Sequence, residues 1–399
     1  MDAKSLMLFV SAITLEVMAT VLFKKGTTRL ANSIRKGWIS HIDNILNALR
    51  TKEIALGIFL YAIEYVCWIA FLAAVDISKA FPLSSIQIVL ILLASRIILK
   101  EHINQYRWLG ATLIIVGIYF VGVDSLLGPN GFIERKNPTT VVLLIHGLTG
   151  TPSEMKHLGR VISRKGISVV CPELAGHCKS IQDLKKTKWQ DWYQSVEKVF
   201  DALKEEFEHV FITGLSMGAL MAMMVAAKRP NQVAGVIPLS STFFYDGWNI
   251  SKFQQKVLLP IVLYSPLKYF LEWEEKSPYG IKCERTRALV HSILENKDAR
   301  TADKIGYFKT PATVILESFH LIRATEKIMK DVTCPLLIVH STEDEMASIK
   351  NAYYVEKHVS SKHIETMYID DTYHVVTLDK RKDDIGKRMA EFCYAIQGL

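Results

Sequence analysis

The sequence has few cysteines, and their spacing matches neither a redox motif nor a metal site. No two of them form a Cys-x-x-Cys pair, and none is grouped with histidines at the spacing of a zinc site. We therefore expect no metal and no cofactor, and we interpret the cysteines as unpaired structural thiols. They are Cys67, Cys171, Cys178, Cys283, Cys334 and Cys393.

Basic clusters interleaved with aromatic residues, which a nucleic-acid surface would need, are also lacking. The net charge is +8 and divides evenly, because the parts before and after residue 130 each carry an excess of four basic residues. Such a diffuse excess is typical of a protein that faces a membrane. The sequence thus predicts contact with the bilayer and no nucleic-acid partner.

The first 127 residues hold long apolar runs, whereas residues 130–399 have the composition of an ordinary globular domain. These runs approach the roughly 20 residues that a helix needs to cross a bilayer. The first run carries Glu16 and lacks the small-residue cleavage site of a signal peptide, so we interpret it as a retained helix. Residues 1–127 are therefore predicted to form an all-α, four-helix transmembrane domain of a multi-pass protein. The runs lie at 5–23, 54–75, 80–99 and 108–123.

Basic residues beside these runs predict how the chain crosses the membrane. Ten of them lie in or beside the first and third connecting loops, against four on the opposite side. This count places both termini and the second domain on the periplasmic or outer face of a bacterial inner membrane. The five cysteines of the second domain favour a reducing compartment instead. The sequence therefore does not decide on which side of the membrane the second domain lies.

Two acidic residues, Glu16 and Glu64, lie within the apolar runs. A carboxylate in hydrocarbon costs several kcal/mol unless it is protonated, paired or facing a wet cavity. Both are therefore candidate functional residues of the membrane domain. The alternative is a polar contact between helices or with a neighbouring chain.

The membrane domain resembles the drug/metabolite transporter superfamily over about its first 125 residues. The segment 15–20 (Leu-Glu-Val-Met-Ala-Thr) is similar to the first helix of the small multidrug resistance transporters, whose matching glutamate binds cation or proton. The segments 80–84 and 94–96 are more similar to the flippase subunits for undecaprenyl-phosphate aminoarabinose. Leu83 stands in place of a drug-binding aromatic residue, which favours lipid-linked or amphiphilic cargo. The resemblance also implies a homodimer through this domain.

Residues 128–137 are rich in turn-forming residues and poor in apolar ones, which predicts a linker. Beyond it, apolar runs of buried-strand type, such as 141–145 and 335–340, alternate with helical patterns. This alternation predicts an α/β domain over residues 138–399, with a mostly parallel sheet covered by helices on both faces.

The stretch 210–220 has the pattern of a nucleophile elbow. Strand residues run into Gly214-Leu215-Ser216-Met217-Gly218, and helix-prone residues follow. Such a turn is too tight for side chains at the two glycines, and it presents the serine hydroxyl above the sheet at the positive end of a helix. Ser216 is therefore the predicted nucleophile.

A nucleophilic serine needs an acid and a base, which follow it along the chain in that order in this type of turn. Asp344, which comes after a predicted strand, is the predicted acid. Its neighbours Glu343 and Glu345 are interpreted as ordinary surface charges. His374, which follows the predicted strand 366–369, is the predicted base.

Residues 140–397 resemble the α/β-hydrolases of the monoacylglycerol-lipase and microbial-carboxylesterase group. The resemblance rests on His146-Gly147-Leu148-Thr149-Gly150, on the elbow, and on the segments 343–346 and 373–379. It implies an oxyanion hole formed by the backbone N–H groups of Leu148 and Met217.

An aromatic-rich insertion separates the predicted strands that end at residue 239 and begin at residue 335. We expect residues 244–325 to form a cap over Ser216 that favours an acyl or alkyl group, and the alternative is extra helices packed on the core. The sequence predicts a membrane-tethered serine hydrolase that cleaves carboxylic esters of lipids or amphiphiles, while amides and thioesters stay open. Two alternatives are a transporter or flippase with an accessory hydrolase, and a hydrolase that its membrane domain merely anchors.

Overall fold

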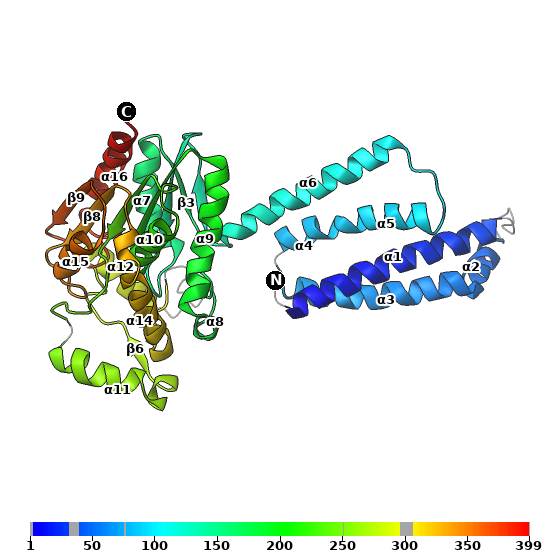
Figure 1. Ribbon diagram of the computed structural model, residues 1–399. Coiled ribbons are helices and arrows are strands. Elements are labelled where there is room, and N and C mark those ends of the chain that lie inside the picture. The colour runs from blue at the N-terminus through cyan, green and yellow to red at the C-terminus, as the bar shows by residue number, and fades with distance from the viewer. Residues whose placement is uncertain (1–2, 32–39, 76, 250, 296–305, 399) are drawn as a thin grey trace. The chain divides into compact units, whose positions relative to one another are not determined.

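The computed structural model describes residues 3–31, 40–75, 77–249, 251–295 and 306–398 (Figure 1). The chain divides into two compact units, Met1–Ser125 and Leu126–Leu399. The division falls close to the segment 128–137 that the sequence analysis assigned to a linker. That segment nevertheless contains a strand, β1 (Phe132–Glu134), which pairs antiparallel with β3 (Ser168–Cys171).

The first unit is helical. Among the described residues, three segments are long and apolar enough to cross a membrane, namely Ser5–Leu30, Lys52–Leu72 and Ala80–Ile97. Pro82 lies inside the third segment, which is divided into two helices there. The fourth predicted run lies within α6, and its crossing stays a prediction. The helices are α1 (Ala3–Ala31), α2 (Ser40–Arg50), α3 (Lys52–Leu72), α4 (Ile77–Ser84), α5 (Ile86–Ile97) and α6 (Gln105–Leu127).

Helices α1 and α3 pack closely because small residues lie where they meet. Ala12 and Ala19 of α1 are buried, and a Cβ added at Gly57 of α3 would lie 2.7 Å from the Phe23 ring. On the outer surfaces of these helices, many large apolar side chains are exposed, including Met7, Val10, Phe59 and Val66. Such a surface suits a hydrocarbon solvent, in which helices satisfy their own backbone hydrogen bonds.

The second unit is built on a seven-stranded sheet with the order β1-β3-β2-β4-β5-β8-β9. Every neighbouring pair except β1 and β3 is parallel. Successive side chains of a strand point to opposite faces, and both faces here are apolar, so the strands read as continuous hydrophobic runs. The remaining strands of this sheet are β2 (Thr140–Ile145), β4 (His209–Leu215), β5 (Gly235–Leu239), β8 (Leu336–Ser341) and β9 (Ile364–Ile369).

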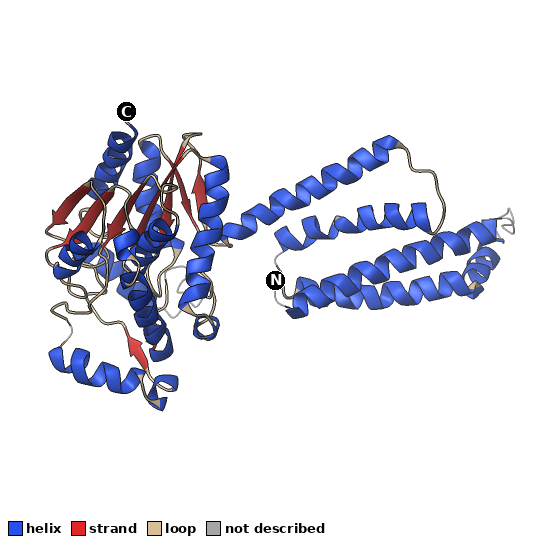
Figure 2. Cartoon of the chain, in the orientation of Figure 1, coloured by secondary structure: helices blue, strands red, loops and turns tan. Residues whose placement is uncertain are grey.

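Helices cover both faces of this sheet, as Figure 2 shows. One face packs on α7 (Pro152–Arg164) and α16 (Lys382–Gln397) through apolar residues such as Leu158 and Phe392. The other face packs on α9 (Trp189–Glu206), α10 (Met217–Lys228) and α15 (Lys350–His358). The α/β-hydrolase fold with a mostly parallel sheet is therefore confirmed.

The insertion between β5 and β8 contains short elements and one long helix. The long helix, α14 (Ala312–Glu326), buries Val314, Leu321 and Ile322 in the core, so this part of the predicted cap packs on the sheet unit. Residues 250 and 296–305, which the predicted cap 244–325 includes, lie outside the described residues. The other elements of the insertion within the described residues include η1 (Gln254–Leu258), α11 (Leu259–Leu263), η2 (Pro266–Tyr269), β6 (Glu272–Glu274), α12 (Glu284–Glu295) and β7 (Lys309–Pro311). The short helix η3 (Met329–Asp331) follows α14 just before β8, and the short helix α8 (Ile181–Lys186) lies outside the insertion.

Candidate active site

Ser216 occupies the turn between β4 and α10, with a backbone conformation that L-residues rarely adopt. Its φ is 55° and its ψ is −111°. Strain of this kind costs on the order of 1–3 kcal/mol and persists only where the surroundings fix it. Here the Ser216 N–H donates to the carbonyl oxygen of Leu239 at 2.9 Å, which ties the turn to β5.

The two glycines of the turn have no room for side chains. A Cβ on Gly214 would collide with the backbone of Gly218, and a Cβ on Gly218 would collide with the carbonyl oxygen of Ile145 in β2. The glycine spacing read from the sequence is thus a packing requirement of this turn. It lets α10 begin directly behind Ser216.

His374 and Asp344 form a buried pair at the carboxyl ends of neighbouring strands. His374 Nδ1 lies 2.8 Å from Asp344 Oδ2, and each residue is only 4% exposed. The other carboxylate oxygen of Asp344 accepts the N–H groups of Met346 and Ala347 at 2.9 and 2.8 Å. Three contacts therefore fix the carboxylate, and the carboxylate in turn orients the imidazole.

The Ser216 hydroxyl is directed at Thr242 in this structure. Its Oγ lies 2.9 Å from Thr242 Oγ1, and Thr242 in turn donates to the carbonyl oxygen of Ser240 at 3.2 Å. His374 Nε2 is buried and has no hydrogen-bond partner within the described chain. The structure thus joins the predicted base to the predicted acid, but it does not join the serine to the base. Hydrogen bonds between catalytic groups are often absent without substrate and form only when it binds.

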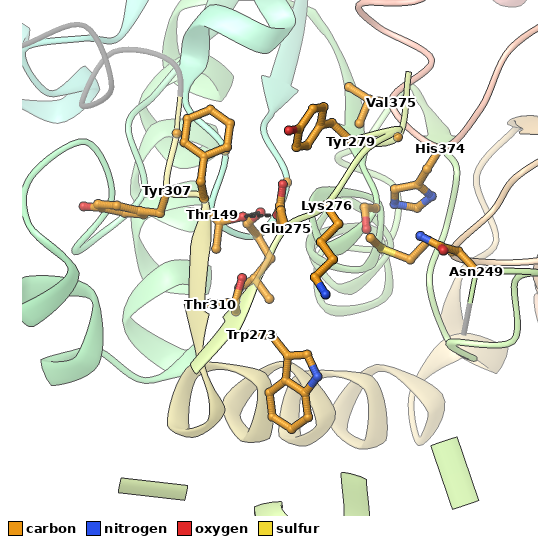
Figure 3. A pocket seen from close by; sticks show the side chains of 18 of the residues that line it. Thr149, Asn249, Trp273, Glu275, Lys276, Tyr279, Tyr307, Thr310, His374 and Val375 are labelled. Carbon is orange, nitrogen blue, oxygen red and sulfur yellow. Dashed lines mark hydrogen bonds between the residues drawn. The ribbon is translucent and has the colours of Figure 1, made fainter. Parts of the chain in front are cut away.

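Ser216 and His374 both line one cavity of about 730 Å³. Residues of the insertion line it as well, among them Trp273 and Tyr279 (Figure 3). Leu259 of α11 is a further lining residue. A cavity of this size accommodates a ligand of drug-like dimensions, and its mixture of aromatic and polar walls is typical of a binding site. The predicted cap thus contributes to the same space that the predicted nucleophile faces.

The two backbone groups predicted for the oxyanion hole have no internal acceptor. Met217 is the first residue of α10, where N–H groups lack a partner within the helix. Neither its N–H nor that of Leu148 donates to another residue in the described parts of the chain. Leu148 lines the cavity beside Ser216. Both donors are available to an oxygen that develops negative charge.

One interpretation of the sequence was wrong, because Glu345 is not a surface charge. It is 2% exposed, and its Oε2 accepts the backbone N–H of His374 at 3.0 Å. Glu343, by contrast, forms a partly exposed ion pair with Lys282. Thr242 was also missed, since no local pattern indicates which residue of a neighbouring loop reaches the elbow.

Negative charges surround the His374 imidazole. Burial by itself lowers the pKa of His374, but the Asp344 carboxylate, the hydrogen bond to it, and the charges of Glu345 and Glu154 outweigh burial and raise the pKa to about 9. The same contacts hold the pKa of the Asp344 carboxyl below its ordinary value, although burial opposes ionisation. The pair therefore favours the imidazolium–carboxylate state.

The pH dependence of activity should reflect this raised pKa. Because His374 accepts a proton only when neutral, we expect kcat/KM for a neutral ester such as p-nitrophenyl butyrate to rise with pH through a limb near 9. Glu345→Gln removes one negative charge, so its limb should move to lower pH. The measurement is kcat/KM between about pH 6 and 10. Glu205→Gln, at an exposed position of α9, should keep the limb in place. A wild-type limb at the ordinary histidine value of 6.5 would contradict this account.

The two acidic candidates of the membrane unit lie on neighbouring helices. Glu16 of α1 and Glu64 of α3 are partly buried, and they lie near enough for their charges to interact. Close by, Thr20 Oγ1 of α1 lies 2.8 Å from the Tyr61 hydroxyl of α3. The structure thus brings together the two acids that the sequence singled out.

Comparisons with known proteins match the two parts of the chain separately. Residues 136–381 match the family described as serine aminopeptidase, S33, and residues 5–123 match the EamA-like transporter family. The thermostable monoacylglycerol lipase of Bacillus sp. (strain H-257) is 29% identical over 267 residues, which are 67% of this chain and 95% of that protein.

A probable 4-amino-4-deoxy-L-arabinose-phosphoundecaprenol flippase subunit ArnE of Pseudomonas savastanoi pv. phaseolicola is 32% identical over 87 residues. These residues are 22% of this chain and 76% of that protein. A solved structure from work on the metagenome-derived lipolytic enzymes LipS and LipT has a TM-score of 0.56 at 24% identity. The match covers 66% of this chain and 97% of the chain in that structure. At this identity, the similarity shows the fold alone. Both resemblances predicted from the sequence are confirmed.

Proposed function

Because the chain belongs to the serine aminopeptidase S33 family through residues 136–381, we propose that it is a membrane-tethered serine hydrolase acting on carboxylic esters of lipids or amphiphiles. The strongest support is the geometry of one cavity, which Ser216 and His374 both line. In it, Asp344 holds the imidazole of His374 and leaves Nε2 without a partner. The similarity to a monoacylglycerol lipase adds weight to an ester substrate.

The proposed reaction passes through an acyl-enzyme. Ser216 Oγ attacks the ester carbonyl while His374 Nε2 takes its proton, and Asp344 stabilises the resulting imidazolium. The N–H groups of Leu148 and Met217 donate to the oxyanion. The imidazolium then protonates the departing alcohol. Water next attacks the acyl group with His374 again as base, which releases the carboxylic acid and restores the serine.

Covalent labelling tests this proposal directly. A fluorophosphonate reacts with a serine only where a base activates the hydroxyl, so we expect one adduct per chain, located at Ser216 by peptide mass spectrometry. Protein denatured before labelling serves as the control. An absence of labelling in the folded, detergent-solubilised chain, or an adduct at another serine, would refute the proposed role of Ser216.

The surface of the insertion supports an amphiphilic substrate. Its elements η1, α11 and η2 carry exposed large apolar side chains, and Phe270 is 81% exposed. Basic residues lie among them, including Lys256 and Lys268. An apolar surface with basic neighbours is suited to the boundary between headgroups and acyl chains. We propose that this surface contacts the bilayer from which the substrate comes.

The membrane unit supports a second function, the movement of a lipid-linked or amphiphilic cargo. The observation in its favour is the proximity of Glu16 and Glu64 on two apolar helices, in a unit similar to flippase subunits. Glu16→Gln in the full chain should abolish cargo movement across vesicles while ester hydrolysis stays within about twofold. The measurement is accessibility of a headgroup-labelled lipid to an added quencher. Equal transport by the variant would exclude a role for Glu16, and absence of transport by the wild-type chain would leave the membrane unit as an anchor for the hydrolase.

Pairing of two chains through the membrane unit, and the side of the membrane that bears the hydrolase, stay predictions. Crosslinking of the full chain in native vesicles would test the homodimer. Protease protection of residues 126–399 in sealed vesicles of known orientation would test the predicted periplasmic or outer location. Both measurements use the chain with its membrane unit intact.

A further inference from the structure

Three glutamates from separate segments line the cavity that contains Ser216. Glu154 lies in the first turn of α7, Glu275 follows β6 in the insertion, and Glu345 follows β8. They line the same cavity, although one belongs to a core helix, one to the insertion and one to the loop at the carboxyl end of β8.

Each carboxylate is held at one oxygen only. Glu154 Oε1 accepts the N–H of Gly147, Glu275 Oε1 accepts the Thr149 hydroxyl at 3.3 Å, and Glu345 Oε2 accepts the N–H of His374. The second oxygen of each accepts no hydrogen bond from any other described residue. Each of the three carboxylates is therefore held in place and still has one oxygen free to accept hydrogen bonds.

An independent observation places the ligand among these acids. His374 lines the same cavity, and its buried Nε2 has no hydrogen-bond partner in the described chain. Since Nε2 must meet the reacting hydroxyl and the departing group, the ester is bound beside it. The three acids thus line the space in which the ester is bound.

The charges already present do not neutralise the three acids. Two further glutamates of the cavity wall have partners, because Glu272 pairs with Lys185 at 2.8 Å and Glu274 lies 4.0 Å from Lys309. Lys276 also lines the cavity, as Figure 3 shows, but its side chain is exposed and forms no ion pair with another described residue. The imidazolium of His374 is paired with the Asp344 carboxylate, so one hydrated lysine against the three other carboxylates leaves an excess of negative charge.

We propose that Glu154, Glu275 and Glu345 form a cation-recognition subsite, so that the preferred substrate is an amphiphilic ester carrying a protonated primary amine. The inference rests on the proposed ester hydrolysis and specifies its substrate class. A primary ammonium group offers three donors, and the subsite offers three open acceptors. A quaternary ammonium group has no donors and would leave the carboxylate oxygens unsatisfied.

The ionisation of the subsite agrees with this assignment. Burial raises the pKa of Glu154 to about 7, and the nearby charge of Glu275 adds to the effect. Burial likewise raises the pKa of Glu275 to about 7, with a contribution from Glu345. A bound cation favours the ionised carboxylates and lowers both pKa values. Glu154 and Glu275 are therefore largely ionised at about pH 8, where a primary amine is still protonated.

The test compares esters that differ only in charge. We expect kcat/KM for p-nitrophenyl 6-aminohexanoate to exceed that for the isosteric heptanoate by about tenfold or more at about pH 8, since charge-assisted hydrogen bonds discriminate at that level. A second pair, 4-aminobutyl and pentyl hexanoate, shows whether the amine belongs to the acyl or to the alcohol part. Glu154→Gln and Glu275→Gln should each lower the cationic-to-neutral ratio several-fold. Glu205→Gln should keep it.

Two further measurements separate recognition from folding. The rate of fluorophosphonate labelling reports whether each variant retains an intact nucleophile. Hexylamine should inhibit hydrolysis of the neutral ester by the wild-type chain at concentrations about tenfold below those of 1-hexanol, a comparison that needs no variant.

The outcomes distinguish this inference from the function on which it rests. Hydrolysis of the neutral esters as fast as the cationic ones, or an unchanged ratio in both labelled variants, would overturn the cation subsite and leave the hydrolase standing. Absence of labelling and of all ester hydrolysis would overturn the proposed function, and the subsite with it.

Discussion

Replacing Ser216 with alanine is expected to lower kcat for p-nitrophenyl butyrate by at least about ten-thousandfold. The variant has no nucleophile, so the acyl-enzyme cannot form, and only the oxyanion donors and substrate binding are left. The fold should persist, because alanine makes the same main-chain hydrogen bond to Leu239 and removes one hydroxyl. The measurement is steady-state hydrolysis by the full chain in detergent.

The matched control for this variant is Ser241→Ala. Ser241 is a buried serine in the loop after β5, and its Oγ has no hydrogen-bond partner in the described chain. We expect its kcat to stay within a few-fold of the wild-type value, since no catalytic contact is lost. Undiminished hydrolysis by Ser216→Ala would instead mean that another group performs the attack.

The elbow and the contact between Asp344 and His374 could be predicted because their signals are local. The strand, the two glycines and the helix of the elbow are contiguous in sequence, and the collisions that a Cβ would cause at Gly214 and Gly218 explain the pattern that was read there. Asp344 and His374 each follow a strand, and parallel neighbouring strands bring their carboxyl ends together. The sheet itself followed from continuous apolar runs, which are typical of strands buried on both faces.

What the sequence left out depends on long-range packing. Glu345 looked like a surface residue at the end of a run of three acids, and only the fold shows that it accepts the backbone N–H of His374. Glu154 and Glu275 are distant in sequence from Ser216 and from each other, so no spacing relates them to one cavity. The assigned linker was rich in turn residues, yet three of its residues pair with β3, since a three-residue edge strand leaves almost no periodic signal.

Asp344→Asn is expected to lower kcat by roughly ten-thousandfold, because the amide cannot hold His374 in the tautomer that leaves Nε2 free to accept a proton. The wild-type carboxylate accepts from His374 Nδ1 at 2.8 Å and from two backbone N–H groups. An asparagine NH₂ turned toward Nδ1 would reverse that bond, and one turned toward the backbone would face two donors. Removal of the charge also lowers the pKa of His374, so the alkaline limb of kcat/KM should move toward neutral pH.

Glu343→Gln provides the matched control for this substitution. It makes the same carboxylate-to-amide change one residue away, but the side chain pairs with Lys282 at the surface and does not reach His374. Its kcat should fall no more than a few-fold, because partly exposed ion pairs contribute little. If Asp344→Asn and Glu343→Gln lost activity equally, the effect would belong to the loop as a whole. Only a large difference between these two neighbours assigns the orienting role to Asp344, and thereby assigns the base to His374.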